Sequence, residues 1–194
     1  MGQYVLDDIL LSPEEFRDAL TLRYQFKVQG DKRNCEGYGG SWGLQHALNC
    51  KRGGHVRKRH NEVNQAWCDL AELAFASAVG RGEPVVRAEG EVPGRPALYG
   101  DFSVRGLWAR QRQAILETRV VNTQAASYAQ GDWQKVLIRS ATGKKEQSAK
   151  PCRDKGYDFT PLASNVDGAL EEDGEMFLKK VAHLMSLKWD RTYR

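Results

Sequence analysis

Acidic side chains at three places in the chain have the spacing expected of a metal-dependent hydrolase. Asp101 and Glu117 each lie in a short segment where apolar and polar residues alternate, and Glu62 lies near the start of a long helical pattern. Two carboxylates held close together repel one another, and a divalent cation relieves that repulsion. Mg²⁺ held in this way polarises a phosphate and lowers the pKa of a bound water, while a nearby Lys or Arg stabilises the developing charge. Taken alone, the spacing is more typical of surface acids in cross-strand pairs, so it does not by itself indicate a metal site.

A second group of residues has the chemistry of a zinc site. Cys35 is followed at short spacing by His46 and Cys50, and thiolates and imidazole are the ligands that zinc prefers in tetrahedral sites. Tyr38 stands where a second cysteine would complete the usual Cys-x2-Cys pair, which leaves three ligands. A loop with buried thiols and no metal is equally consistent with this pattern.

A basic run follows directly. The segment 51–60 contains no acidic residue, and its charged positions come just before and within the start of a predicted helix. Such a run is typical either of a solvated loop or of a phosphate-binding patch, because free N–H groups at a helix start also attract anions. The basic residues of this run are Lys51, Arg52, Arg57, Lys58 and Arg59.

Length and composition limit the classes of protein that the chain can belong to. It has 194 residues, 41% of them hydrophobic, which suits one domain with an appendage. The net charge of +4 is compatible with nucleic-acid binding but does not argue for it alone. No apolar run is long enough to span a membrane, and the acidic N-terminal stretch lacks the basic start of a signal peptide. We therefore expect a soluble, intracellular protein.

The chemistry-bearing residues need elements to position them, and the hydrophobic periodicity predicts these. A helix begins at Ser12-Pro13, and the Gly-rich segment 31–54 has no sustained period. Helical patterns then cover 56–79, 133–148 and 170–189, and strand patterns cover 85–92, 98–104, 114–121 and 157–162. The chain is therefore predicted to form a mixed α/β domain over 55–194, with an annex over 1–54 that contains the Cys/His segment.

The strand patterns predict how the two strand acids are presented. Alternate side chains of a strand share a face, so Asp101 lies on one face of its segment and Phe102 on the other. In the next strand, Glu117 and Arg119 share a face. If the two strands pair antiparallel, we expect Asp101 and Glu117 to lie close together on one face.

Several short segments of the chain, in this order, carry a family resemblance that covers about 16–193. They are Leu22-Arg23-Tyr24, Cys35 with His46-Ala47-Leu48-Asn49-Cys50, Lys51-Arg52-Gly53-Gly54, Arg59-His60-Asn61-Glu62-Val63, Glu83-Pro84, Asp101-Phe102-Ser103-Val104-Arg105-Gly106-Leu107-Trp108, Glu117-Thr118-Arg119-Val120 and Phe159-Thr160-Pro161-Leu162. The ordered set resembles the restriction-enzyme-like endonuclease domain of non-LTR retrotransposon polyproteins, and stand-alone proteins derived from such a domain.

The resemblance implies a PD-(D/E)xK-type nuclease that nicks DNA with Mg²⁺ or Mn²⁺, built on a central mixed sheet flanked by helices. It implies no small-molecule cofactor, no membrane association, and a nuclear location in a eukaryotic cell. Its metal-binding acids correspond to Asp101, Glu117 and Glu62. The basic catalytic position corresponds to Arg119 in line, or to the pair Lys144-Lys145 on a downstream helix. The zinc element corresponds to Cys35, His46 and Cys50.

The chain departs from this pattern at three positions. Tyr38 replaces a zinc ligand, Glu117 replaces an Asp, and Gly100 precedes Asp101 where Pro is common. These departures leave a second function open, namely an inactive module that still binds DNA. The candidate DNA-binding residues are the basic run together with Arg105, Arg110 and Arg112 of the connection between the two strands.

Overall fold

The computed structural model describes residues 43–128 and 131–190, and individual positions before them (12, 13, 16, 17, 20, 24, 34, 35, 37, 39 and 40). The chain divides into two compact units, Met1–Gly53 and Gly54–Arg194, each of which is described by itself. Most of the helix expected after Ser12 lies outside the described residues, although Phe16 N–H donates to Ser12 O at 2.8 Å. In the first unit, the described helix is α2, Leu44–Asn49. A 3-10 turn, Arg52–Gly54, precedes the first helix of the second unit.

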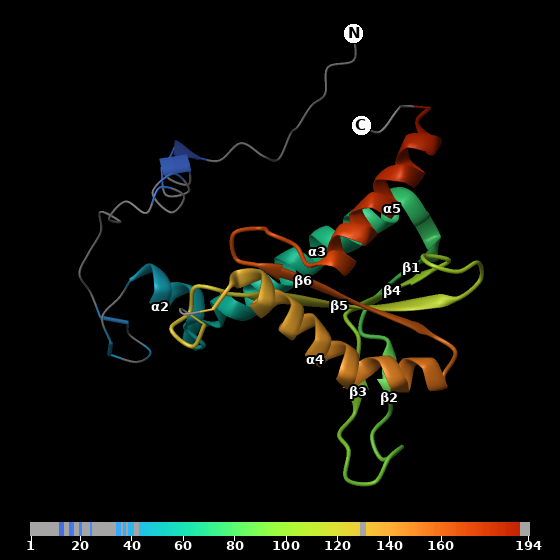
Figure 1. Ribbon diagram of the computed structural model, residues 1–194, viewed down its shortest axis with the longest axis horizontal. Coiled ribbons are helices and arrows are strands. Elements are labelled where there is room, and N and C mark those ends of the chain that lie inside the picture. The colour runs from blue at the N-terminus through green and yellow to red at the C-terminus, as the bar shows by residue number, and fades with distance from the viewer. Residues whose placement is uncertain are drawn as a thin grey trace. The chain divides into compact units, whose positions relative to one another are not determined.

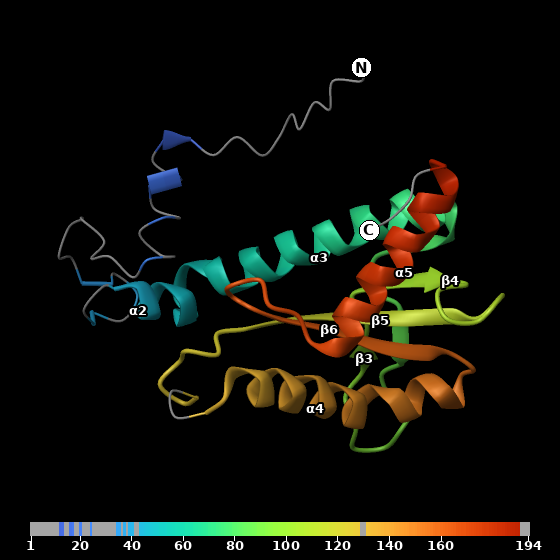
Figure 2. The same ribbon diagram turned by 45° about the horizontal axis from the view of Figure 1, so that its top comes forward.

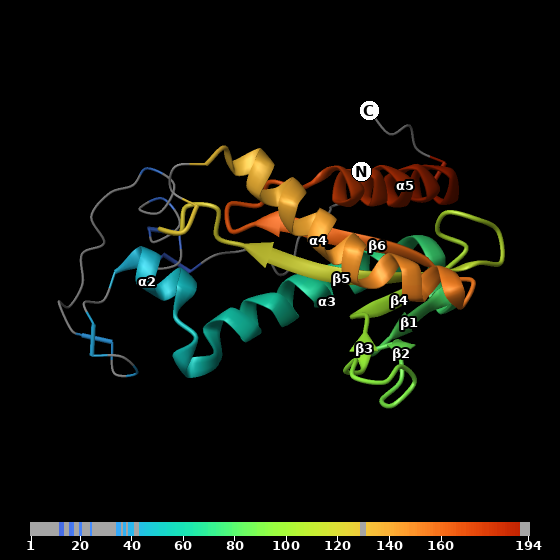
Figure 3. The same ribbon diagram turned by 60° about the horizontal axis from the view of Figure 1, so that its bottom comes forward.

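The described part of the second unit contains a four-stranded mixed sheet of order β1-β4-β5-β6. The strands are β1 Val79–Arg81, β4 Phe102–Arg105, β5 Gln113–Val121 and β6 Asp158–Asn165. β1, β4 and β5 pair antiparallel, whereas β5 and β6 pair parallel, as the matching arrows in Figure 3 show. A separate two-stranded sheet joins β2, Val85–Arg87, to β3, Leu98–Tyr99. The prediction of a mixed sheet is confirmed.

Helices cover both faces of the four-stranded sheet. Figure 2 shows α3, His55–Phe75, and α5, Glu172–Lys188, on one side, with α4, Trp133–Asp154, on the other. On the first side, Trp67 of α3 meets Phe177 of α5 edge to face, with ring centroids 5.6 Å apart. Both rings are buried against Phe102, Val104 and Leu116 of the sheet, so this side contains the largest core cluster.

The helices form where the sequence periodicity predicts an apolar face. In α3, Trp67, Cys68 and Ala71 are buried, and the helix ends where Ala76 adopts a left-handed φ of 48°. In α4, the Asp132 side chain caps the start by accepting from Gln134 N–H at 3.0 Å. α4 extends past the predicted end to Asp154, because its buried face continues through Cys152. Among the described helices, none is both long and apolar enough to cross a membrane.

Besides the strand expected over 85–92, which ends at Arg87 as β2, two predicted elements differ from the structure. The segment expected to continue the α3 helix to residue 79 instead forms a 3-10 turn, Ala76–Ala78, followed by β1. The single strand expected over 98–104 is divided at Gly100-Asp101 into β3 and β4, which belong to different sheets. Both outcomes depend on pairing with distant segments (Val79 opposite Val104, for example), which periodicity alone does not report.

Candidate functional site

Asp101 lies directly before β4 and attaches that strand to β5 by two hydrogen bonds. Its backbone N–H donates to Leu116 O at 2.9 Å. Its carboxylate Oδ2 accepts from Thr118 N–H at 2.6 Å. β4 pairs with β5 only as far as Leu116, because β4 begins at Phe102. The Asp101 carboxylate therefore takes the place of a strand partner for the Thr118 N–H.

Gly100 allows this geometry because there is no space for a side chain. A Cβ at this position would lie 2.3 Å from Ile115 Cγ2 and 3.3 Å from Leu116 O. The Gly100 N–H also donates to Pro84 O at 2.9 Å, a bond that proline could not make. The close contact with β5 therefore explains why this chain has Gly rather than Pro before Asp101.

His60 of α3 contacts Asp101, although the sequence pattern gave it no role in the site. Its Nε2 lies 3.4 Å from Asp101 Oδ2 and 3.1 Å from Thr118 O. The contact with Asp101 is the main reason why the pKa of His60 is raised above its usual value, against the opposing effect of partial burial. A signal was present, since His60 precedes Val63 by three residues and Trp67 by seven, the spacing of one helix face.

Glu117 lies in β5 and is paired with Lys144 of α4. Glu117 Oε1 accepts from Lys144 Nζ, and the two side chains are 12% and 24% exposed. Glu117 Oε2 is buried with no hydrogen-bond partner. Burial raises the pKa of Cys152 on α4 to about 11, and the nearby charge of Glu117 adds to this effect. One oxygen of the Glu117 carboxylate is therefore paired with α4, and the other is buried without a partner.

The two acids lie on neighbouring strands, but their contacts are with different helices. β4 and β5 pair antiparallel with Phe102 opposite Leu116, so Asp101 and Glu117 are the next facing positions, which confirms the predicted pairing. The prediction that both side chains face one side is wrong in its details. Asp101 contacts His60 of α3, whereas Glu117 contacts Lys144 of α4, across the sheet. The physical reason is that Asp101 precedes the strand, so the alternation of the pleat does not fix its direction.

Glu62 does not join this group, contrary to the expectation for a third ligand. Glu62 pairs with Lys58 at 3.6 Å, and its side chain is 64% exposed. Two residues correspond to about 200° around a helix, so Glu62 lies opposite His60 on α3. Together with Arg57 and Lys58 it lines an open hollow of about 560 Å³ on the outer face of that helix.

The candidate basic residues are separated by the fold. Lys144 reaches Glu117, but Lys145, the next residue of α4, pairs with Asp173 at 2.5 Å. Arg119 is exposed on β5. Consecutive helix residues point about 100° apart, so only one lysine of the pair can face β5.

The candidate DNA-binding arginines and lysines also have different environments. Arg57 and Lys58 are exposed on α3, whereas burial lowers the pKa of Arg59. Arg105 and Arg110 are exposed, and Arg112 pairs with Asp158 at 3.1 Å. Lys51 and Arg52 are exposed in the first unit.

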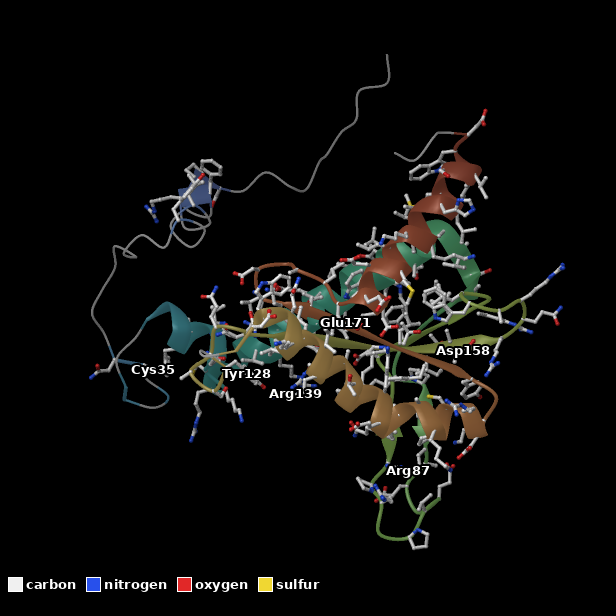
Figure 4. All side chains as sticks on the ribbon, in the orientation of Figure 1. Cys35, Arg87, Tyr128, Arg139, Asp158 and Glu171 are labelled. Carbon is white, nitrogen blue, oxygen red and sulfur yellow. The ribbon has the colours of Figure 1, made fainter. Side chains whose placement is uncertain are left out.

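In the first unit, Cys35, His46 and Cys50 converge as predicted. Their potential ligand atoms all lie within 4.8 Å of one another, and the two sulfurs are 3.8 Å apart. Cys50 ends α2, where its N–H donates to His46 O at 2.7 Å, so one helical turn brings these two ligands together. Cys35 is the labelled residue of this unit in Figure 4. The group is able to hold a metal ion such as zinc. Tyr38 lies outside the described residues.

No model of a known protein family and no curated protein matches this chain. The assignment of function therefore rests on the residues and their geometry.

Proposed function

We propose that this chain is a divalent-metal-dependent DNA endonuclease with a restriction-enzyme-like core. The observation that carries the proposal is the position of Asp101 opposite Glu117 on paired strands, with Lys144 bound to Glu117. The mixed sheet with helices on both faces agrees with the fold that the sequence resemblance implies (Figure 1).

The residues present fit a divalent cation. Glu117 has one buried oxygen without a partner, and a carboxylate oxygen is the ligand that Mg²⁺ prefers. Glu117 would hold Mg²⁺ or Mn²⁺ through this oxygen, and the metal would supply the charge that polarises a phosphate and lowers the pKa of water. Because Asp101 contacts α3 and Glu117 contacts α4, Asp101 would share the ion only if one of the two carboxylates turned away from its present partner. Thr118 N–H and His60 orient the Asp101 carboxylate, and the Lys144 ammonium is placed to offset negative charge that develops on the phosphate.

The experiment is nicking of supercoiled plasmid with Mg²⁺, with Mn²⁺ and with EDTA. We expect the wild type to nick only with metal, and Asp101→Asn, Glu117→Gln and Lys144→Met each to lower the rate by about 100-fold or more. The matched control is Lys150→Met, on the same helix but 82% exposed, which should nick like the wild type. Absence of metal-dependent nicking by folded wild type would refute the proposal.

A second candidate is a DNA-binding module without cleavage. It is favoured by the position of Glu62, and by the protein side chains that already contact Asp101 and Glu117, namely His60 and Lys144. Duplex binding would then depend on the exposed Arg57 and Lys58. Replacing both by Ala should lower the slope of log affinity against log salt by about 0.9 for each phosphate that the side chains no longer neutralise. An unchanged slope would mean that this part of α3 is only a solvated face.

We also propose that the Cys35, His46 and Cys50 group binds zinc, with water as a fourth ligand. Metal analysis of the purified protein should find zinc, and Cys50→Ser should lose it. Zinc retained in full by Cys50→Ser would refute this assignment.

A further inference from the structure

A groove runs along the outer edge of β6, away from the pair Asp101 and Glu117. β6 is an edge strand, and its first residues lie between α4 and α5. The groove has a volume of about 340 Å³, which is within the usual range for small-ligand sites. Figure 4 labels Asp158 where β6 begins and Glu171 directly before α5.

Trp108 forms one aromatic wall of the groove. It belongs to the connection between β4 and β5, and its indole remains 38% exposed. Its Nε1–H donates to Thr160 Oγ1 at 2.7 Å, and Thr160 is buried in β6. The hydrogen bond satisfies the only polar atom of the indole and holds the ring against the groove. The exposed part of the ring is therefore free to make apolar and stacking contacts.

Two further aromatic side chains line the same groove. Tyr157 lies directly before β6 and Phe159 is the second residue of that strand; both line the groove. Both pack on the buried cluster of Val86, Leu98, Ile115 and Cys152, which fixes their positions. The groove thus presents aromatic rings that the core already immobilises, which lowers the entropy cost of stacking a ligand on them.

The charges of the groove suit an anionic ligand. Asp158 is paired with Arg112 at 3.1 Å, and Asp173 with Lys145 at 2.5 Å. These pairs neutralise the two acids of the groove, and the exposed Arg153 of α4 adds a positive charge. Fixed aromatic rings beside arginines are the arrangement that binds single-stranded nucleic acid, by base stacking and phosphate contact.

We propose that this groove binds a base and an adjoining phosphate of single-stranded nucleic acid, with Trp108 as the stacking platform. The proposal rests on the proposed nuclease function and deepens it, because the ligand would be the strand end that is released at a nick. Arg112 and Glu117 are five residues apart, so the groove begins about 16 Å along β5 from the candidate metal site.

The test is fluorescence anisotropy of a labelled oligothymidylate with the full chain in EDTA, where no cleavage occurs. We expect Trp108→Ala to weaken binding by about tenfold, and Trp108→Phe, which keeps an aromatic ring, by much less. Arg153→Ala should lower the salt slope by about 0.7. The matched control is Trp189→Ala, a tryptophan 52% exposed at the end of α5, which should bind like the wild type.

The outcomes separate this proposal from the nuclease proposal. Trp108-dependent binding without nicking would support the groove and refute the nuclease. Oligothymidylate binding that is equal in the wild type, Trp108→Ala and Trp189→Ala, or that is absent, would overturn the groove proposal whatever the plasmid assay shows. If Trp108→Ala fails to fold by circular dichroism, Arg153→Ala decides, and an affinity and a salt slope equal to those of the wild type in that variant would overturn the proposal.

Discussion

Substituting Gly100 by Ala tests whether the backbone contact before Asp101 is as close as the structure indicates. The new Cβ would lie 2.3 Å from Ile115 Cγ2, whereas carbon atoms in contact are normally about 3.5–4.0 Å apart. Ile115 is 1% exposed and is packed among other core residues, so it has no space to move. The strands must separate locally by more than about 1 Å to accept the methyl group.

Overpacking of this kind costs about 3 kcal/mol at the upper end of its range, and the lower entropy of the unfolded Ala chain offsets somewhat less than 1 kcal/mol. We therefore expect Gly100→Ala to lower the free energy of unfolding by about 2 kcal/mol, measured by urea denaturation with tryptophan fluorescence. The corresponding fall in Tm is about 4–8 °C.

The matched control is the same substitution at Gly143, inside α4, where a Cβ would have no atom within 4 Å. Gly143→Ala should raise the free energy of unfolding by about 1 kcal/mol, because Ala is the better helix former. Ile115→Leu removes the clashing Cγ2 at a similar volume, so Gly100→Ala should cost at least about 1 kcal/mol less in that background. Shifts of the same sign at Gly100 and Gly143, or no relief by Ile115→Leu, would refute the close contact.

Two further predictions concern the charged pairs beside Asp101 and Glu117. In metal-free buffer, NMR titration should give His60 a pKa above 6.5, and Asp101→Asn should lower it, because the carboxylate stabilises the imidazolium. The raised pKa of His60 contributes stability that is fully present below 6.5, the pKa in the unfolded chain, and that is lost as the pH rises through the pKa in the folded protein. The difference in the free energy of unfolding between wild type and Asp101→Asn should therefore shrink between these two pKa values. Lys144→Met leaves Glu117, 12% exposed, without its cation and should destabilise the protein by about 2 kcal/mol; adding Glu117→Gln should recover at least about 1 kcal/mol of this in urea unfolding, and additive losses would contradict the pairing.

The sequence by itself determined the features that depend on neighbours along the chain. The spacing of Val63, Trp67 and Leu70 predicted α3, because an apolar stripe at helical spacing must face a core. The alternation around Glu117 predicted β5, and the short spacing of His46 and Cys50 after Cys35 predicted a group of potential zinc ligands, although not the helix α2 that contains His46. The same information placed Asp101 and Glu117 on adjacent segments.

Only the tertiary structure decided which of these side chains contact one another. His60 and Thr118 are far apart in the chain, as are Lys144 and Glu117, and each pair meets because a helix packs on a particular face of the sheet. The local pattern gives a helix face but not the strand beneath it, so it did not separate Lys144 from Lys145, or exclude Glu62. The contact of Gly100 with Ile115, and the bond from Trp108 to Thr160, likewise depend on strand pairing and on packing between distant segments. Periodicity records whether a side chain is buried, whereas its partners are fixed only when the elements pack together.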